Sequence, residues 1–270
     1  MATCITVAMR KGGVGKTATV ANLAGLMALE GKKVLVVDTD SQGNCTDLMT
    51  GFDVFSERFK NAGIFEMFRF YGGLPTEKFI THTNVENVDI IPANGMSAKT
   101  SSQIAILSES GDLSKNLYLA DSLSQISDRY DYIVIDTAPG DDLLFHNALI
   151  ASDYVLVPCK IDDYSESSLS WTFATCKIIE KEENAEINIL GIFYTLVEKV
   201  TQVKLIREKI SQSKYAGYIM NTEIRKNQAA NDMTTYKLPA VICAKSSNVA
   251  KDYTALWAEI KKRIRKLERA

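Results

Sequence analysis

Residues 10–17 have the composition and spacing of a loop that binds phosphate groups. They read Arg-Lys-Gly-Gly-Val-Gly-Lys-Thr, so Gly12, Gly13 and Gly15 come just before Lys16 and Thr17. Glycines let backbone N–H groups close around phosphate oxygens, and the N-terminus of a following helix favours anions. A lysine at the end of such a loop reaches the outer phosphates, and the threonine hydroxyl binds magnesium. The stretch predicts a nucleotide site that uses Mg²⁺.

Two residues of this loop depart from the common pattern G-x-x-x-x-G-K-[ST]. Arg10 stands at the first position of the pattern, where a glycine is expected. Lys11 is a second lysine, five positions before Lys16. A lysine at a loop surface is ordinarily just solvated, so Lys11 gains meaning only from its neighbours in the loop.

Three acidic residues follow predicted buried strands. Asp38 and Asp40 end the run Val-Val-Asp-Thr-Asp, and Asp136 ends Tyr-Ile-Val-Ile-Asp. In doubly wound sheets, ligands bind where the carboxyl ends of the strands meet. A carboxylate at that edge suits magnesium, often through a bound water, which makes Asp136 a metal-site candidate together with Thr17. Asp38 is either structural or part of the site, and the Gly140 N–H is a candidate contact for the terminal phosphate.

The elements that must position these residues follow from the apolar pattern. Short apolar runs alternate with amphipathic stretches, which is typical of an α/β protein with a doubly wound, mostly parallel sheet flanked by helices. The predicted strands are Cys4–Ala8, Lys33–Asp38, Val88–Pro92, Tyr132–Asp136, Tyr154–Pro158, Ile187–Thr195 and, as a further candidate, Tyr218–Met220. The predicted helices are Thr17–Leu29, Leu117–Arg129, Glu166–Glu182, Gln202–Ser213 and Val249–Arg265.

Residues 47–83 fit this alternation least well. They are rich in phenylalanine, and we interpret them as short helices over one end of the sheet, with the aromatic residues serving as core or lid. Since there is no internal repeat or low-complexity linker, we expect residues 1–270 to form one domain. His82 and His146 have no partners at the spacing of a triad or metal site, so we expect both to be structural.

The composition excludes several other classes of protein. The 270 residues, 46% of them hydrophobic, suffice for a sizeable core. Five cysteines without a C-x-x-C pair indicate neither a disulfide framework nor a zinc site, and we expect reduced thiols. No leader precedes the first strand, and no apolar run approaches the roughly 18 residues of a membrane span. We therefore expect a soluble, cytoplasmic protein.

Positive charge is concentrated locally, although the net charge is −2. Residues 261–270 hold six basic side chains and one acidic one, and residues 199–226 are also rich in lysine and arginine. Such patches are compatible with weak, salt-sensitive DNA binding. For the C-terminal helix, a solvated end, a DNA-facing patch and a membrane-surface helix all remain open.

Three motifs, in this order, resemble the ParA/MinD family of deviant Walker-type ATPases, and most of all the small, Soj-like ParA DNA-partitioning ATPases. They are residues 11–17, residues 38–44 (Asp-Thr-Asp-Ser-Gln-Gly-Asn) and residues 135–139 (Ile-Asp-Thr-Ala-Pro). Ser41 stands where the family usually has proline. Residues 147–158 and 237–240 are similar more weakly, so the resemblance spans nearly the whole chain. The phosphate loop begins at residue 10, which favours the small type over the longer, autorepressing one.

The resemblance implies ATP and Mg²⁺ as cofactors, and slow hydrolysis by an ATP-sandwiched homodimer that binds DNA without sequence preference. Lys11 would reach the partner's phosphates in trans, much as an arginine finger does. Asp40 would activate the attacking water, which makes Lys11, Lys16 and Asp40 the catalytic candidates. The nucleotide contacts would be Lys11, Gly12, Gly13, Val14, Gly15, Lys16, Thr17 and Ala18. A ParB-like, centromere-binding partner would stimulate hydrolysis, and the protein would associate with the nucleoid.

The departures from the family leave the DNA contacts and the adenine contacts open. The family's Arg-Thr pair is replaced by Val200-Thr201, with Lys199 and Lys204 nearby, and its I-P-R-N is only approximated by residues 223–227. The ends of Ile187–Thr195 and the segment 221–227 are candidates for the neighbourhood of the base. No cysteine pair matches the cluster ligands of nitrogenase iron proteins. Two rival functions are a MinD-like, membrane-cycling ATPase and a nucleotide-switched binding module with negligible turnover.

Overall fold

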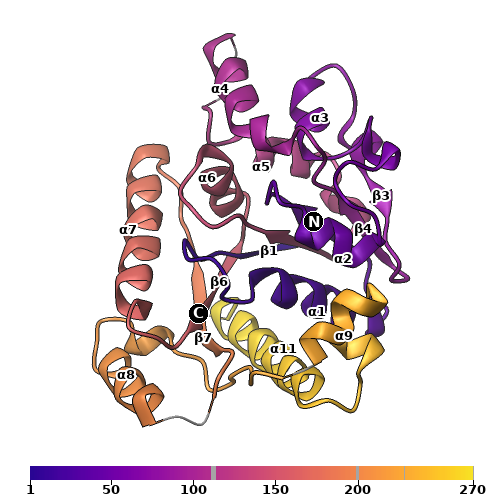
Figure 1. Ribbon diagram of the computed structural model, residues 1–270. Helices are drawn as coiled ribbons and strands as arrows, with labels where there is room; N and C mark the ends of the chain where they lie inside the picture. Colours follow the sequence, from indigo (N-terminus) through magenta and orange to yellow (C-terminus); the bar gives the residue numbers. More distant parts are fainter. Residues whose placement is uncertain (111–113, 199–200, 228, 270) are drawn as a thin grey trace.

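The chain folds around a seven-stranded sheet with helices on both faces, as the computed structural model shows (Figure 1). The structure describes residues 1–110, 114–198, 201–227 and 229–269. The strands are β1 (Thr3–Val7), β2 (Val34–Asp38), β3 (Thr81–His82), β4 (Val88–Ile91), β5 (Tyr132–Asp136), β6 (Tyr154–Lys160) and β7 (Ile189–Thr195). Their order is β3-β4-β2-β5-β1-β6-β7, and every pair is parallel except β3 with β4. The predicted fold class is confirmed.

Helices connect these strands and cover the sheet. The α-helices are α1 (Lys16–Leu29), α2 (Asn44–Thr50), α3 (Ile64–Arg69), α4 (Thr100–Ser110), α5 (Tyr118–Ser124), α6 (Leu143–Ile150), α7 (Ser165–Glu183), α8 (Thr201–Ser211), α9 (Ala229–Tyr236), α10 (Ala240–Cys243) and α11 (Asn248–Leu267). The 3₁₀ turns are η1 (Glu57–Phe59), η2 (Thr76–Phe79), η3 (Ser97–Lys99), η4 (Ser127–Arg129) and η5 (Ala216–Tyr218). In Figure 1, α1 and α11 lie on one side of the sheet and α5 and α6 on the other.

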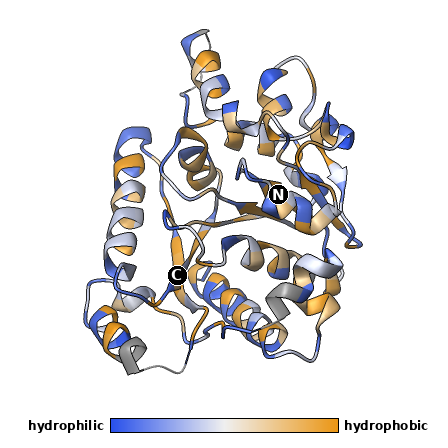
Figure 2. Cartoon of the chain, viewed as in Figure 1, coloured by the Kyte–Doolittle hydropathy of each residue, from blue (hydrophilic) through white to orange (hydrophobic). Residues whose placement is uncertain are grey.

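The core lies between the sheet and these two helical layers. All five residues of β2 are buried, as expected for a strand whose apolar residues are continuous rather than alternating. Apolar side chains of α1, α10 and α11 pack on one face, and those of α3 to α6 pack on the other. The central strands are correspondingly largely orange in Figure 2, whereas β3 is pale and the helices are mixed in colour. The five cysteines are free thiols, four of them buried.

Two elements differ from the sequence prediction. Tyr218–Met220 is not a strand, because η5 ends there and only Ile219 forms a bridge, to Ile192. The Arg263 guanidinium donates a hydrogen bond to the Ile219 carbonyl at 2.7 Å. A side chain therefore occupies an acceptor that the N–H of a neighbouring strand would use in a sheet. The single helix predicted over 117–129 is divided into α5 and η4. The Ser127 hydroxyl bonds the Ser124 carbonyl at 3.2 Å there, a local contact that competes with helix continuation.

Residues 47–83 form short helices, as the sequence predicted, and pack beside β2 and β4. Phe59, Phe68 and Phe79 are buried, whereas Phe55 is exposed. The two-residue strand β3, antiparallel to β4 at the sheet edge, was not predicted. Its shortness leaves no alternation for a pattern to detect.

Candidate nucleotide-binding site

Strand register brings the phosphate loop and the three acidic residues to one edge of the sheet. β5 lies between β1 and β2, and its last residue, Asp136, pairs with Val7 on one side and Asp38 on the other. The phosphate loop follows β1 directly and leads into α1 at Lys16. Parallel pairing therefore places residues that are about a hundred positions apart in sequence around one loop.

The phosphate loop has room above its glycines. Gly13 and Gly15 have φ angles of 69° and 85°, in the left-handed region that glycine adopts without strain. Chain neighbours apart, no atom of the described residues lies within 4 Å of the point where a Cβ would stand on Gly13, Gly15 or Gly140. The first N–H groups of α1 have no side-chain cap at Gly15. Open space beside free N–H donors fits the phosphates of a nucleotide.

Lys16 is a buried cation within this loop. Only 6% of its surface is exposed, and its Nζ donates to the carbonyls of Met9 and Lys11, each at 3.1 Å. Burial lowers the pKa of the Lys16 ammonium, whereas the carboxylates of Asp136 and Asp40 oppose that shift. The side chain is thus held at the loop by acceptors that a phosphate oxygen can replace.

Thr17 and Asp136 form a hydrogen-bonded pair in which one carboxylate oxygen of Asp136 has no partner among the described residues. The Thr17 hydroxyl donates to Oδ2 of Asp136 at 2.7 Å, while Oδ1 is buried without a partner among the described residues. Burial raises the pKa of Asp136 well above its usual range, and repulsion from Asp38 adds to this, against the Thr17 hydrogen bond and Lys16. A hydroxyl and an unsatisfied carboxylate oxygen are hard donors that fit Mg²⁺.

Asp38 and Asp40 have different surroundings. Both carboxylate oxygens of Asp38 are occupied: Oδ2 accepts from the Thr46 N–H and hydroxyl at 2.8 and 2.7 Å, and Oδ1 from the Asp40 N–H at 3.1 Å. Burial raises the pKa of Asp38 to about 6, although the Thr46 contacts oppose this. Asp40 accepts one bond, from the Gln42 N–H at 2.9 Å. Asp38 thus holds the start of α2, and the carboxylate of Asp40 keeps free acceptor positions.

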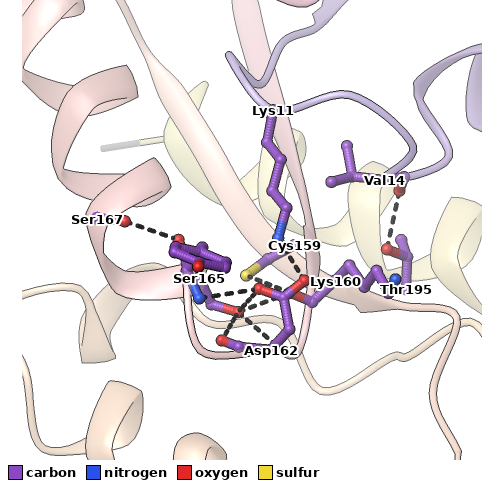
Figure 3. Close-up of polar contacts among 9 residues, drawn as sticks. Lys11, Val14, Cys159, Lys160, Asp162, Ser165, Ser167 and Thr195 are labelled. Atoms are coloured by element: carbon purple, nitrogen blue, oxygen red, sulfur yellow. Dashed lines mark hydrogen bonds and ion pairs between the residues drawn. The ribbon is translucent and has the colours of Figure 1, made fainter.

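Lys11 points to the loop of its own chain that carries Asp162 and Ser165 (Figure 3). Its Nζ forms an ion pair with Asp162, and the Tyr164 ring centre lies 5.7 Å from the same nitrogen. Asp162 is held in turn by the Tyr164 N–H at 3.1 Å and by Ser165, whose hydroxyl accepts from the Asp162 N–H at 2.7 Å. Burial is the largest influence on the pKa of Asp162 and raises it, but the hydrogen bonds from Lys11 and the Tyr164 N–H, together with the charges of Lys11 and Lys160, outweigh burial and lower the pKa.

Arg10, the departure from the loop pattern, has an acidic partner as well. Its guanidinium lies 3.2 Å from Asp141, and the Trp171 ring centre is 5.1 Å away. Asp141 also contacts the His146 ring at 2.7 Å. Sequence reasoning singled out neither Asp141 nor Asp162. The available signal was position, because each acid closely follows a strand, β5 or β6, at the edge that carries the loop.

The segments predicted to lie near the base meet beside the loop. The Thr195 hydroxyl, at the end of β7, donates to the Val14 carbonyl at 2.8 Å. The Ile224 N–H bonds the Tyr194 carbonyl at 2.8 Å, and Val197 bridges Arg225. Their role toward a base stays a prediction.

The basic stretch 199–226 is largely engaged in ion pairs where it is described. Lys199, Val200 and the side chains of Thr201 and Lys204 lie outside the described residues. The remaining pairs are Arg207–Glu223, Lys209–Glu166, Arg225–Asp252 and Lys226–Glu198, at 2.5 to 2.6 Å. In the described part of the chain, no helix is long and apolar enough to cross a bilayer.

Known proteins are similar in sequence to this chain over most of its length. The family described as an AAA domain matches residues 2–189. The chain is 28% identical over 267 residues to sporulation initiation inhibitor protein Soj of Bacillus subtilis, covering 96% of this chain and 98% of that one. It is 31% identical over 256 residues to chromosome-partitioning ATPase Soj of Treponema pallidum, covering 93% and 94%.

Solved structures show the same fold. A McdA variant of Cyanothece in complex with ATP has a TM-score of 0.80 at 17% identity, covering 97% of this chain and 96% of that one. Cobyrinic acid a,c-diamide synthase of Mycobacterium smegmatis, with a bound ATP analogue and magnesium, has a TM-score of 0.74 at 22% identity, covering 88% and 93%.

The parallel sheet and its glycine loop define the class of P-loop nucleotide-binding α/β proteins. Within that class, the matches over nearly the full chain are decisive, since both Soj relatives and this chain align almost end to end. The chain belongs to the ParA/MinD family of P-loop ATPases.

Proposed function

We propose that the protein is a Mg²⁺-dependent ATPase that partitions DNA, acting as an ATP-bound homodimer. The observation that carries the proposal is the group formed by the buried Lys16 and Asp136 and the half-buried Thr17 at the glycine loop, with Asp40 alongside. A cation, a hard oxygen pair and an acid with free acceptor positions are the components that phosphoryl transfer to water requires. The partition role comes from the Treponema pallidum relative, which is named a chromosome-partitioning ATPase.

Each residue at the loop has a defined part in this proposal. The backbone of residues 12–18 and the Lys16 ammonium bind the phosphates, and Thr17 and Asp136 hold Mg²⁺, with Asp136 acting through a bound water. When bound, the metal neutralises charge that develops on the phosphate oxygens. Asp40 accepts a hydrogen bond from the attacking water and orients it.

Lys11 makes turnover depend on assembly. Its ammonium is paired with Asp162 of the same chain. We propose that dimer formation exchanges this partner for the phosphates of the second subunit, where the cation stabilises the transition state in trans. Turnover is then slow in the monomer and rises when DNA and a ParB-like protein favour the closed dimer.

The structure of α11 favours DNA over a membrane as the second ligand. A membrane-surface helix inserts an apolar face into lipid. The apolar side chains of α11 are instead buried against the sheet and α1, and they include Tyr253, Leu256, Trp257, Ile260 and Ile264.

The decisive experiment measures ATP turnover of the full chain alone, with DNA, and with DNA plus a ParB-like protein. Sedimentation in ATP, ADP and no nucleotide runs in parallel. We expect slow basal turnover, an ATP-specific dimer and stimulation by the combination. ATP binding and partner exchange with negligible turnover under every condition would instead identify a nucleotide-switched binding module.

A further inference from the structure

The last turns of α11 carry basic side chains on the side of the helix that faces away from the core. Lys262, Arg265, Lys266 and Arg269 are exposed, while Trp257, Ile260 and Ile264 on the opposite side are buried. Lys262, Arg265 and Lys266 lie in α11, and Arg269 follows two residues after its end; because these residues are spaced three and four apart, they form one stripe. From residue 262 to residue 269, seven steps of about 1.5 Å, this stripe is about 10 Å long.

These four cations are unpaired within the described part of the chain. None of them has an ion-pair partner, in contrast to Arg207, Lys209, Arg225 and Lys226 of the other basic stretch. The two remaining basic residues of the helix end are engaged: Lys261 pairs with Glu30 at 2.5 Å, and Arg263 bonds backbone carbonyls. The end of α11 therefore carries four unpaired cations close together.

A groove of about 960 Å³ runs beside this stripe. It is lined by the basic residues of α11 together with Asn221 and Glu259. The Glu259 carboxylate accepts hydrogen bonds from the N–H groups of Asn221 and Thr222 at 2.9 Å and from the Thr222 hydroxyl at 2.8 Å. The charge of this one acid in the groove lining is offset by the Arg263 guanidinium, 3.4 Å away.

We propose that this α11 groove binds the sugar-phosphate backbone of DNA; the inference rests on the proposed partition function. A stripe of about 10 Å spans roughly three phosphates of one strand along the duplex axis. Exposed lysine and arginine at this spacing contact phosphates whatever the base sequence. A lipid surface fits less well, since Leu267 is the one exposed large apolar residue in the described part of α11.

The groove and the phosphate loop lie at opposite ends of the strands. Arg263 bonds the Leu190 carbonyl near the start of β7, and Arg265 lines a small cavity with Thr3 and Tyr132, the first residues of β1 and β5. The nucleotide cannot touch DNA bound there. ATP therefore acts through dimerisation, which joins two grooves, so the gain in affinity comes from bivalent binding.

The test compares DNA binding of the wild-type chain and of two charge-matched double variants. One carries Lys262→Glu with Lys266→Glu; the control carries Lys78→Glu with Lys99→Glu, exposed residues on the other side of the sheet. Binding to plasmid DNA, and to a duplex of about two helical turns, is measured over a range of salt with ATP and with ADP. Basal ATP turnover, expected to be unchanged in both variants, reports on folding.

We expect the α11 variant to lose at least tenfold in affinity and its salt slope to fall by about 2, as for two lost phosphate contacts, while the control binds like the wild type. ATP should strengthen binding of the wild type to plasmid DNA more than to the short duplex. Equal DNA binding by the two variants would overturn the groove assignment and leave the partition function standing. A wild-type chain that binds vesicles of phosphatidylethanolamine and phosphatidylglycerol, and no DNA, would overturn both.

Discussion

Charged side chains have opposite surroundings at the two ends of the parallel strands. At the carboxyl end, Lys16, Asp38 and Asp136 are buried, and each contacts another polar group. At the amino end, Lys262, Arg265, Lys266 and Arg269 of the α11 groove are exposed and have no ion-pair partner among the described residues. Buried charge is costly unless it is paired with good geometry, whereas exposed charge costs little. We therefore expect the first end to be specific for one ligand geometry and the second to respond to the charge density of its ligand.

This contrast predicts that substitutions at the carboxyl ends of the strands change nucleotide binding and hydrolysis. Substitutions at the amino ends should change the binding of DNA. The largest effect is expected for Lys16→Ala. The substitution removes the loop cation that faces the phosphates, and ATP binding should fall below detection in calorimetry, with turnover lost as well. Retained affinity would show that the buried group is not the nucleotide site, and the comparison of the two ends would fail.

Lys11→Ala should bind ATP nearly as the wild type does but lose about 10³-fold in turnover, the range expected for a cation supplied in trans. The variant should also fail to form the ATP-specific dimer in sedimentation. Normal cycling by this variant would confine Lys11 to its ion pair with Asp162.

Asp40→Ala should retain ATP and accumulate as an ATP-bound dimer, because only the orientation of the water is lost. We expect single-turnover hydrolysis to slow by about 10²-fold or more. A variant that hydrolyses at the wild-type rate would rule out Asp40 as the water-orienting acid.

Asp38→Ala should act on stability rather than on turnover. It leaves the Thr46 N–H and hydroxyl and the Asp40 N–H without their acceptor, a loss of about 1–3 kcal/mol. The pKa of Asp38 is raised from 3.8 to about 6, so in this pH range the folded state binds more protons than the unfolded state. The contribution of Asp38 to stability therefore falls as the pH rises through this window. Urea denaturation should therefore show a larger loss at pH 4.5 than at pH 7. An equal loss at both would contradict the assigned pKa.

Asp162→Ala should have the smallest effect. A partly exposed ion pair contributes up to about 1 kcal/mol, so freeing Lys11 should lower the protein concentration needed for the ATP dimer by two- to fivefold. Weaker dimerisation would mean that Asp162 orients Lys11 for the partner rather than retaining it.

The local parts of the site could be predicted from the sequence, because their signals are local. The glycine spacing before Lys16 and the acid at the end of the buried run 132–136 need only short-range patterns. The distinction between Asp38 and Asp40 could not be predicted, since it depends on where the Thr46 hydroxyl lies. Nor could Asp162, which meets Lys11 across 151 positions.

The fold, too, could be predicted only where its signal is local in the sequence. The buried strands were predicted closely, whereas Tyr218–Met220 and the helix over 117–129 were wrong or incomplete. In both places a side chain, Arg263 or Ser127, satisfies a backbone carbonyl that a regular element would otherwise use. Such competition is decided by neighbours that a linear pattern does not contain.

The sequence by itself determined the kind of chemistry: a glycine loop with two lysines, and acids placed at the ends of apolar strands. Composition also showed where basic residues cluster. Only the tertiary structure decided which of those residues are free, because an ion pair forms where the fold brings opposite charges within contact distance. That is why Arg207, Arg225 and Lys226 are paired with acids of the same chain, while four basic residues at the end of α11 are left without an ion-pair partner among the described residues.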